Sequence, residues 1–591
     1  MSRGAASRLS PRRRRADAAR LGAEEFDVVV VGGGVTGAGA AVDAASRGLS
    51  VALVEARDLA AGTSSRSSKL IHGGLRYLEQ FEFGLVHEAL TERGLLATRL
   101  APHLVRPVPF LVPLAAPPGV RGWPLRAARR AYYGAGLALY DTFATALGSG
   151  RGMPVHQHLG RAAARRLMPS LRADAVTGAI RYYDAQMDDA RMVVALARTA
   201  ASLGAAVLTS SRVVAINRTA REVTGVRVHD TETGAVRDVR ARTVIAATGV
   251  WSDEISGLLR DIGVRPGLRV RASKGVHLVV PRAAISGTAG LILRTASSVL
   301  FVIPWGGHWI VGTTDTDWRF DRDRPAATAA DIRYLLDQVN PVLDRPLTPA
   351  DIEGVYAGLR PLLTGDSEAT SALSRRHAVV EPMLGLLLVA GGKYTTYRVM
   401  AADVVDRAAR RLRRDVPASR TDQLPVLGAD GFHALWRDRA DVARRHQVSA
   451  GVVEHLLERY GSAALDLLRL VADAPALGAP LPGAPEYLGA EVAYAAAAEA
   501  ALHLDDVLTR RTRIGIETPH RGVDTGPATA RIMGGVLGWD RARQDWEVDR
   551  YRERVDAERR SQQMPDDAAA AAVRRAVGDA RTTAAQGAPG H

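Results

Sequence analysis

The chain has 591 residues, of which 47% are apolar, a length and composition that suit a globular protein of two or three domains. It contains no cysteine, which excludes disulfides, thiolate metal sites and cysteine nucleophiles. The net charge of +15 favours anionic partners, and no run of about 18 apolar residues predicts a membrane-spanning helix.

The start of the chain is strongly basic. Seven arginines lie within residues 1–20 against the single acid Asp17, and the apolar stretch of a secretory signal is missing. We therefore predict a disordered basic tail over residues 1–25. Such a tail could bind anionic lipid or nucleic acid, and a solvated tail without a partner is equally compatible with the sequence.

A βαβ unit follows. The β-branched run 27–31 predicts a buried parallel strand, the small residues of 38–48 predict a helix, and 49–56 predicts a second strand. Between strand and helix stands G-x-G-x-x-G, formed by Gly32, Gly34 and Gly37. The first glycine permits a tight turn, the second lets the backbone approach a pyrophosphate, and the third allows close helix packing. Glu55 follows Gly37 by 18 residues, as expected of an acid that binds ribose hydroxyls, so we predict a dinucleotide site.

A hydroxyl-rich stretch after Glu55 favours FAD over NAD, as does the position of the glycine motif at the start of the fold. Small donors could bind a pyrophosphate or the edge of a flavin without crowding it, and they are Thr63, Ser64, Ser65, Ser67 and Ser68. A serine-rich surface loop would explain these hydroxyls but not the sequence KLIHGGLRY that follows at residues 69–77.

Lysine is rare, and only Lys69, Lys274 and Lys393 occur among 78 lysines and arginines. All three lie beside glycine-rich or hydroxyl-rich motifs. Lysine is a compact cation with a movable pKa, whereas arginine is a large planar fork that stays charged. The pattern favours lysines placed near a bound anion or a redox ring, and chance placement is the alternative.

The rest of the chain mixes strands and then turns helical. Short strand-like runs over 205–249, 270–314 and 386–392 predict a mixed or antiparallel sheet over the cofactor and a strand returning to the first sheet. Beyond about residue 415 the pattern is helical. We predict an α/β (α+β) fold with a Rossmann-like dinucleotide domain, a mixed or antiparallel-sheet substrate domain and a C-terminal α-helical domain.

The stretch GTSSRSSKLIHGGLRYLE closely resembles the FAD-dependent glycerol-3-phosphate dehydrogenase family, of the membrane-associated respiratory type. Further similar stretches follow in the family's order over residues 26–400, among them YYDAQMDDARMV, AATGVWSDE, KGVHLVVPR, LFVIPWGGHWIVGTTD, AGLRPL and GGKYTTYR. The resemblance implies FAD-dependent oxidation of sn-glycerol 3-phosphate to dihydroxyacetone phosphate, with electrons passed to a membrane quinone.

With this resemblance the chain divides into four parts. They are a basic tail (1–25), an FAD-dependent oxidoreductase region (26–415), a C-terminal helical domain (416–560) and a disordered tail (561–591). Within the oxidoreductase region, FAD-binding parts interleave with a substrate-binding subdomain and cover about 26–100, 190–260 and 380–415.

The implied substrate is a secondary alcohol with a phosphate dianion, so its oxidation needs a hydride acceptor, a base and a cationic clamp. Two histidines, His72 and His277, are candidate bases, because an imidazole pKa near ~6.5 suits this work at neutral pH. By resemblance we favour His277 and interpret His72 as a neighbour of the flavin. The candidates for the phosphate clamp are Arg76, Arg360 and the lysines, and arginine binds phosphate through two parallel hydrogen bonds. Tyr77 could bind substrate, and a core tyrosine is the alternative reading.

Lys393 completes the predicted catalytic set, close to flavin or substrate, where positive charge would raise the flavin potential. Lys274 precedes His277 by three residues, so on a regular strand the two side chains point to opposite faces and do not share the site. The predicted cofactor contacts are Gly32, Gly34, Gly37, Glu55, Thr63, Ser64, Ser65, Ser68, Lys69, His72, Gly73, Thr248, Gly249, Gly392 and Thr395. No metal ligand is predicted.

The segment 123–147 reads as a basic helix that could lie in a bilayer interface, and a core helix is equally compatible. With the resemblance, this predicts a cytoplasmic protein held peripherally on the anionic inner face of the cell membrane. The sequence is compatible with a homodimer and does not decide the oligomeric state.

Two other readings remain. One is a flavin oxidase of the same superfamily that uses oxygen, acting on glycerol 3-phosphate or on an amine or amino acid. The other is a basic nucleic-acid-binding protein with a structural flavin, but zinc spacing and an RNP-like aromatic strand are both missing, so we expect no specific nucleic acid.

Overall fold

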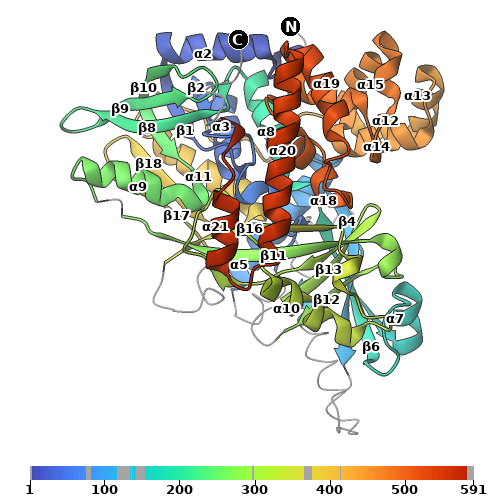
Figure 1. The fold of residues 1–591 in the computed structure, drawn as a ribbon. Coiled ribbons are helices and arrows are strands. Elements are labelled where there is room, and N and C mark those ends of the chain that lie inside the picture. The colour runs from blue at the N-terminus through green and yellow to red at the C-terminus, as the bar shows by residue number, and fades with distance from the viewer. Residues whose placement is uncertain are drawn as a thin grey trace.

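The computed structural model describes residues 3–74, 82–115, 134, 136, 138–140, 153–265, 267–295, 299–364, 376–412 and 414–581. Two large sheets and a C-terminal set of helices make up this part of the chain (Figure 1). The predicted fold class is confirmed.

The first sheet has a parallel centre. Its parallel strands lie in the order β18 (Leu386–Gly391), β10 (Val236–Ala246), β1 (Glu25–Val31), β2 (Val51–Val54) and β7 (Ala206–Leu208). Almost every residue of β1 and β2 is buried, because both faces of a parallel sheet are covered. Antiparallel strands extend it: β17 (His377–Met383) on β18, and β8 (Ser211–Arg218) and β9 (Val223–Asp230) beside β10.

Helices cover both faces of this sheet. One face packs on α3 (Val35–Ser46), α8 (Asp189–Ser202) and α11 (Tyr397–Ala409). The other packs on α2 (Pro11–Ala23), α9 (Ser252–Asp261) and the β8–β9 pair. The predicted βαβ unit is β1, α3 and β2, and the helix starts earlier than expected because Gly34 is its N-cap.

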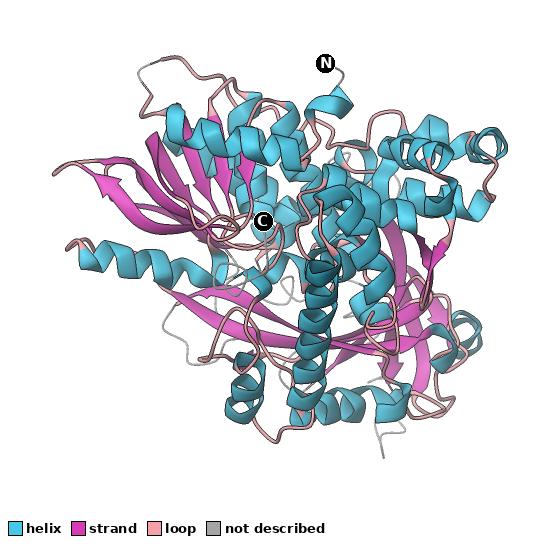
Figure 2. Ribbon diagram, turned by 45° about the horizontal axis from the view of Figure 1, so that its top comes forward, coloured by secondary structure: helices cyan, strands magenta, loops and turns pink. Residues whose placement is uncertain are grey.

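The second sheet has ten strands and is mostly antiparallel (Figure 2). Its main order is β15 (Thr316–Asp317), β11 (Val270–Pro281), β14 (His308–Gly312), β13 (Val299–Trp305), β12 (Gly290–Arg294), β4 (Arg106–Ala115), β6 (Val176–Gln186) and β3 (Leu70–Ile71). Two more strands, β16 (Gly354–Leu363) and β5 (Gln157–Gly160), pair with β11 and β6. The helices α7 (Arg161–Leu167) and α10 (Ala329–Val339) pack on one face, and α5 (Phe83–Leu95) packs on the other.

The C-terminal domain is helical, as predicted. Its helices are α12 (Phe432–Arg437), α13 (Arg439–His446), α14 (Ala450–Tyr460), α15 (Ala464–Asp473), α16 (Gly489–Ala498), α17 (Leu504–Asp506), α18 (Ile514–Glu517), α19 (Gly526–Leu537), α20 (Arg541–Ser561) and α21 (Asp567–Arg575). A small hairpin of β19 (Pro480–Leu481) and β20 (Ala484–Leu488) was not expected. None of the helices in the described ranges is long and apolar enough to cross a bilayer.

The prediction of a disordered tail over residues 1–25 is wrong for most of that segment. A short helix α1 (Arg3–Ala6) precedes α2, and α2 begins after Ser10, whose hydroxyl caps it, with Pro11 in the first turn. Ala18 and Leu21 are buried in the core of the first sheet. The Ser-Pro pair is a helix start signal that the basic composition concealed.

Arg13 and Arg14 of α2 are paired, whereas Arg12 and Arg15 are exposed. Arg13 binds Asp17 at 2.9 Å, and Arg14 binds Asp230 at 2.9 Å. Asp17 is fully buried and also accepts a hydrogen bond from the Val207 amide. The Arg14–Asp230 pair and the Asp17–Val207 hydrogen bond join α2 to the sheet, so composition alone gave a misleading picture of this segment.

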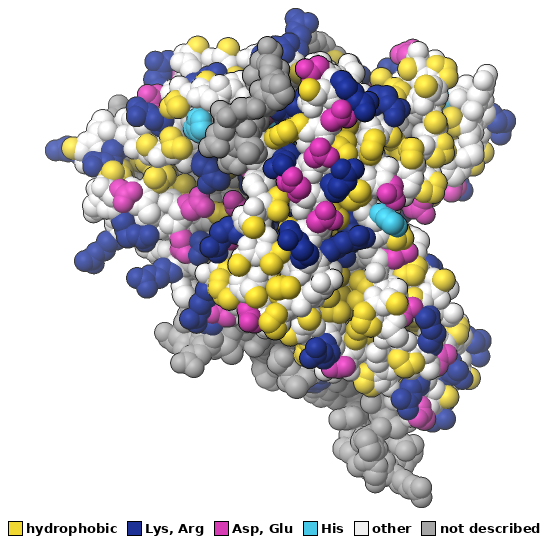
Figure 3. All heavy atoms as spheres, viewed as in Figure 1, with side chains coloured by type: hydrophobic (Ala, Val, Ile, Leu, Met, Phe, Trp, Pro, Cys, Tyr) yellow, Lys and Arg dark blue, Asp and Glu magenta, His cyan; other side chains and the backbone are white. Residues whose placement is uncertain are grey.

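The prediction of a disordered tail over 561–591 is also wrong for its described part. The helix α21 packs beside α20 (Figure 1), and its Asp567 binds Lys274 of β11. Arg581 is buried and donates to the Ser210 hydroxyl at 3.2 Å. The outer face of α20 alternates arginines with acids, as Figure 3 shows, and residues 582–591 lie outside the described ranges.

Replacing Leu21 with alanine tests the role of α2. The side chain is 1% exposed, so Leu21→Ala should lower the free energy of unfolding by about 2–5 kcal/mol. Urea unfolding measures this loss, with the exposed Arg15→Ala on the same helix as control, expected within about 0.5 kcal/mol of wild type. Equal stability of the two variants would contradict a packed α2.

Candidate active site

A large cavity of about 1230 Å³ lies where the two sheets meet. From the first sheet it is lined by residues at the carboxyl ends of β1, β2, β10 and β18, where open α/β sheets bind their ligands. From the second sheet it is lined by residues of β11, β13 and β16. The volume exceeds the ~300–1,000 Å³ of a typical small-molecule pocket, so it can hold a dinucleotide together with a small substrate.

The glycine turn faces this cavity. Gly32 has φ +113°, and a Cβ there would lie 2.5 Å from the Ala247 carbonyl oxygen. A Cβ on Gly37 would lie 1.9 Å from the Gly32 carbonyl oxygen, so α3 could not approach β1 with any other residue. Gly34 caps α3 without a side chain, which leaves the helix N-terminus open to a phosphate.

Glu55 ends β2 at the cavity wall. Its carboxylate accepts the Gly33 amide at 2.6 Å and the Arg57 amide at 2.8 Å. Burial raises the pKa of Glu55, and these two hydrogen bonds oppose that shift. Glu55 lines the cavity, at the position where an acid of this kind binds ribose hydroxyls.

The residues present fit FAD. The Thr248 hydroxyl lines the cavity, is buried and has no hydrogen-bond partner among the residues that the structure describes, as expected of a group that a ligand satisfies. Thr63 and Ser64 line the same region, although Thr63 donates to the Leu359 carbonyl and Ser64 accepts the Val35 amide. No cluster of possible metal ligands occurs within the described ranges.

Most of the predicted site residues lie together. Those that line the cavity are Gly32, Gly34, Glu55, Thr63, Ser64, Ser68, His72, Thr248, Gly249, His277, Arg360, Gly392, Lys393 and Thr395. Gly37 lies behind the turn. Arg76 and Tyr77 fall outside the described residues, so their roles stay predictions, and so do those of nearly all residues in the segment 123–147.

Besides Gly37, three predicted cofactor contacts do not line the cavity, namely Ser65, Lys69 and Gly73. Lys69 is 1% exposed, and its ammonium donates to Asp189 at 2.9 Å and to the Ser65 carbonyl at 3.2 Å. A Cβ on Gly73 would lie 2.8 Å from atoms of Tyr140, so this glycine serves packing. These contacts give Lys69 and Gly73 a structural role, and the prediction that Lys69, Ser65 and Gly73 contact the cofactor stays a prediction.

His277 lies on β11 between β14 and β16. Its Nε2 lies 2.8 Å from the Ser68 hydroxyl, and its ring stacks on Tyr356 with centroids 4.7 Å apart and planes 11° apart. Burial, with the charges of Arg360 and Lys69, holds the pKa of His277 well below its usual range. The ring is therefore neutral at neutral pH and can accept a proton.

Lys274 points away from His277. Its ammonium binds Asp331 at 2.6 Å and also Asp567, and it does not line the cavity. This agrees with the alternation of side chains along a strand.

Arg360 and Lys393 add positive charge to the cavity wall. Arg360 donates to the Thr313 hydroxyl at 3.1 Å and lies 3.7 Å from the Asp315 carboxylate. Lys393 donates to the Gly73 carbonyl at 3.4 Å. Burial lowers the pKa of His72 to about 4, so this second histidine is neutral too.

Several residues of the site escaped the sequence reasoning. Asp315 faces the Arg360 guanidinium, Tyr356 supports His277, and Asp189 binds the segment that carries Ser68. The acidic pair in YYDAQMDDARMV was a usable signal for Asp189. Arg513, which binds Asp189 from the C-terminal domain, has no local motif that marks it.

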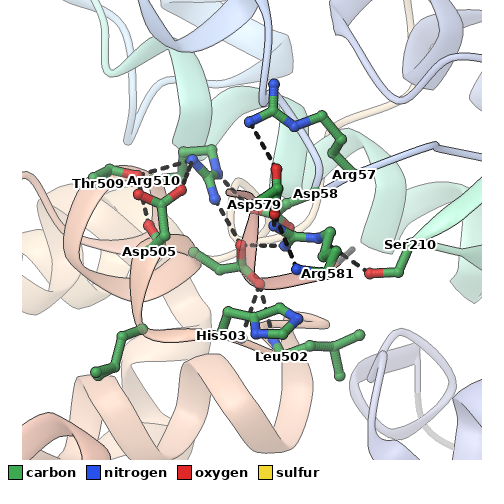
Figure 4. Close-up of polar contacts among 12 residues, drawn as sticks. Arg57, Asp58, Ser210, Leu502, His503, Asp505, Thr509, Arg510, Asp579 and Arg581 are labelled. Carbon is green, nitrogen blue, oxygen red and sulfur yellow. Dashed lines mark hydrogen bonds and ion pairs between the residues drawn. The ribbon is translucent and has the colours of Figure 1, made fainter. Parts of the chain in front are cut away.

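The C-terminal segment contacts Arg57, a residue of the cavity wall (Figure 4). Arg57 lines the cavity and pairs with Asp579 at 3.4 Å. Behind it, Arg510 binds Asp58 at 2.5 Å and Asp505 at 2.8 Å. Residues far apart in sequence thus meet in one ionic network beside the turn that follows β2.

This fold and cavity define a two-sheet FAD-dependent oxidoreductase. A family model described as "FAD dependent oxidoreductase" matches residues 27–398, and one described as "C-terminal domain of alpha-glycerophosphate oxidase" matches residues 419–544. Glycerol-3-phosphate dehydrogenase 2 of Mycobacterium tuberculosis is 54% identical over 576 residues, which cover 98% of this chain and 96% of the relative. The chain belongs to the FAD-dependent glycerol-3-phosphate dehydrogenase family.

More distant relatives agree. The mitochondrial glycerol-3-phosphate dehydrogenase of Rattus norvegicus is 35% identical over 547 residues, which cover 89% of this chain and 72% of the relative. The solved structure of glycerol-3-phosphate dehydrogenase from Bacillus halodurans, complexed with FAD, is similar with a TM-score of 0.73 and 26% identity, covering 93% of this chain and 97% of that one.

His503 makes the stability of the contact between the C-terminal domain and the β9–β10 connection dependent on pH, because it pairs with Glu232 there. It is fully buried, and although burial lowers its pKa, Glu232 and Glu547 raise it to about 10. A folded-state pKa above the unfolded value stabilises the protein fully below about pH 6.5, and that contribution is lost as pH rises through 10. The stability difference between wild type and His503→Gln, measured by urea unfolding, should therefore shrink between pH 6.5 and 10. A constant difference would contradict this charge assignment.

Proposed function

We propose that the protein oxidises sn-glycerol 3-phosphate to dihydroxyacetone phosphate with FAD as cofactor. The observation that carries the proposal is the meeting of a neutral buried imidazole, His277, with the Arg360 guanidinium in the cavity that the dinucleotide turn borders. The relatives named as glycerol-3-phosphate dehydrogenases support the choice of substrate.

The chain's own residues provide the acid–base part of the reaction. Oxidation breaks the C2–H and O–H bonds of the substrate and forms a carbonyl, so a proton and a hydride must both leave. His277 accepts the hydroxyl proton, because its ring is neutral and lies at the cavity wall. Bound FAD supplies the two-electron hydride acceptor that no side chain provides.

Charge and geometry select the phosphate. Arg360 reaches the cavity with its fork held by the Thr313 hydroxyl and by the Thr314 carbonyl at 3.2 Å. A held fork loses little rotamer freedom on binding, and it matches two phosphate oxygens at once. Lys393 adds a second cation on the cavity wall. Glycerol, which lacks the phosphate, would lose these contacts.

The spectrum of the purified protein tests the proposal. The visible flavin bands should bleach on anaerobic addition of glycerol 3-phosphate and should stay unchanged with glycerol or D-alanine. Bands that persist with glycerol 3-phosphate would overturn the substrate, and a protein without flavin after reconstitution would overturn the cofactor. Hydrogen peroxide formed in air without another acceptor would indicate an oxidase.

The pH dependence tests the base. The activity of wild type, as kcat/KM, should stay level as pH falls to 6.5 and decline only below it, because burial and the neighbouring cations hold the pKa of His277 below that value. His277→Asn should lower kcat by about 10²–10⁴-fold while FAD content is kept. An acid limb centred above pH 6.5, or full activity in His277→Asn, would contradict this role.

We further propose that electrons pass to a membrane quinone and that the protein binds the anionic inner face of the cell membrane peripherally. The net charge of +15 and the exposed Arg12 and Arg15 of α2 support attraction to anionic lipid. The protein should sediment with vesicles that contain anionic lipid, be released by salt, and reduce a short-chain quinone in the presence of glycerol 3-phosphate. Absence of binding at low salt would contradict the membrane proposal, and absence of quinone reduction would contradict the acceptor.

A further inference from the structure

Two residues, Ser68 and Tyr356, hold the imidazole of His277. Ser68 belongs to one backbone segment, and Tyr356 is hydrogen-bonded to the same segment. Ser68 contacts Nε2 of His277 at 2.8 Å, and Tyr356 stacks on the ring. The Tyr356 hydroxyl in turn donates to the Ser67 carbonyl at 3.0 Å. The position of residues 65–69, which we name the base-support segment, therefore decides where both neighbours of the imidazole lie.

Asp189 holds the base-support segment. Its carboxylate accepts the Ser67 amide at 3.0 Å, the Ser67 hydroxyl at 2.7 Å and the Lys69 ammonium at 2.9 Å. Lys69 has φ +56°, a left-handed conformation that a non-glycine residue keeps only when its surroundings impose it. The buried ion pair with Asp189 and the bond from the Lys69 amide to the Ser67 hydroxyl are among the contacts that hold this conformation.

Arg513 completes this arrangement from the C-terminal domain. Its guanidinium donates to Asp189 and Asp188 and to the Ser65 carbonyl at 3.3 Å, and the side chain is 1% exposed. Arg513 therefore binds the base-support segment directly at Ser65 and indirectly through Asp189. Its backbone amide is fixed by the Tyr487 hydroxyl at 3.2 Å, so the fork is anchored in its own domain.

We propose that Arg513 is a positioning residue for His277, acting through Asp189 and the base-support segment, so that the C-terminal helical domain completes the active site. The inference rests on the proposed function, because it assigns a role in the same proton transfer. Arg513 touches neither the cavity nor the base. Its effect is to keep Ser68 and Tyr356 at the distances that orient the imidazole.

Arg513→Gln removes the fork, and Arg198→Gln is its matched control. Arg198 is also buried, lies on α8 with Asp189, and binds Glu499 at 3.3 Å and Tyr494 at 2.8 Å in the C-terminal domain. Within the described part of the chain, Arg198 has no hydrogen bond or ion pair with the base-support segment, so its loss weakens the same domain contact without moving Ser68. Ser67→Ala is a milder second variant, which removes the hydroxyl bond to Asp189 and the bond that this hydroxyl accepts from the Lys69 amide.

The measurement is the rate of anaerobic flavin bleaching at saturating glycerol 3-phosphate, with FAD content and the unfolding midpoint recorded beside it. Arg513→Gln should slow bleaching on the order of tenfold, with little change in KM, because the phosphate clamp is untouched. Arg198→Gln should lower the unfolding midpoint comparably and bleach at the wild-type rate. In a Ser68→Ala background the effect of Arg513→Gln should largely vanish, since both changes act on one contact.

The outcomes separate the two proposals. Wild type that fails to bleach overturns the proposed function itself. If wild type bleaches, any one of three results overturns the positioning role. The first is that Arg513→Gln bleaches as fast as wild type, and the second is that Arg198→Gln is slowed as much as Arg513→Gln. The third such result is that the effects of Arg513→Gln and Ser68→Ala on the rate multiply fully. If Arg513→Gln does not retain FAD, Ser67→Ala decides: slower bleaching that disappears in the Ser68→Ala background supports the role, and an unchanged rate overturns it.

Discussion

Buried ion pairs between the C-terminal helices and the rest of the chain are the constraint on which the structure depends. Glu499 forms ion pairs with Arg191 at 2.6 Å and with Arg198 at 3.3 Å, and Arg511 forms one with Asp58 at 2.6 Å. Separating one partner of such a pair leaves an uncompensated buried charge, at a cost of about 3–5 kcal/mol. The helical domain is therefore held in one position against the dinucleotide domain, and the contacts that reach the active site are held with it.

The scarcity of lysine acquires a physical meaning in this setting. Arginine suits the interface because its planar fork can bind two carboxylates or a carboxylate and a carbonyl, as Arg513 does with Asp189 and the Ser65 carbonyl. Lys69 and Lys274 occur where a slim ammonium is enclosed by carboxylates and aromatic rings. Lys69 lies over the Tyr356 ring at 5.0 Å and Lys274 over the Trp318 ring at 5.4 Å. Only Lys393 of the three lines the cavity.

Features that depend on residues close together in the sequence were predicted correctly. The βαβ unit, the glycine turn and the opposite orientation of Lys274 and His277 follow from periodicity and spacing, and the structure has them. The terminal segments were misjudged because their charges find partners far away in sequence, such as Asp230 for Arg14. Arg513 and Asp189 are separated by more than three hundred residues, and no spacing rule connects them. Sequence therefore located the groups of the site, whereas the contacts that orient them needed the fold.

The cations around His277 have two opposing effects on its function as a base. Burial first, and then Arg360 and Lys69, lower the pKa of the imidazole, which guarantees a neutral ring but makes it a weaker base. A phosphate dianion bound by Arg360 would offset part of that positive charge while the substrate hydroxyl waits to be deprotonated. Base strength would then rise as substrate binds, so recognition of the phosphate and activation of the alcohol are coupled through one guanidinium. The Lys69 charge is already balanced by Asp189 and would contribute the constant part of the shift.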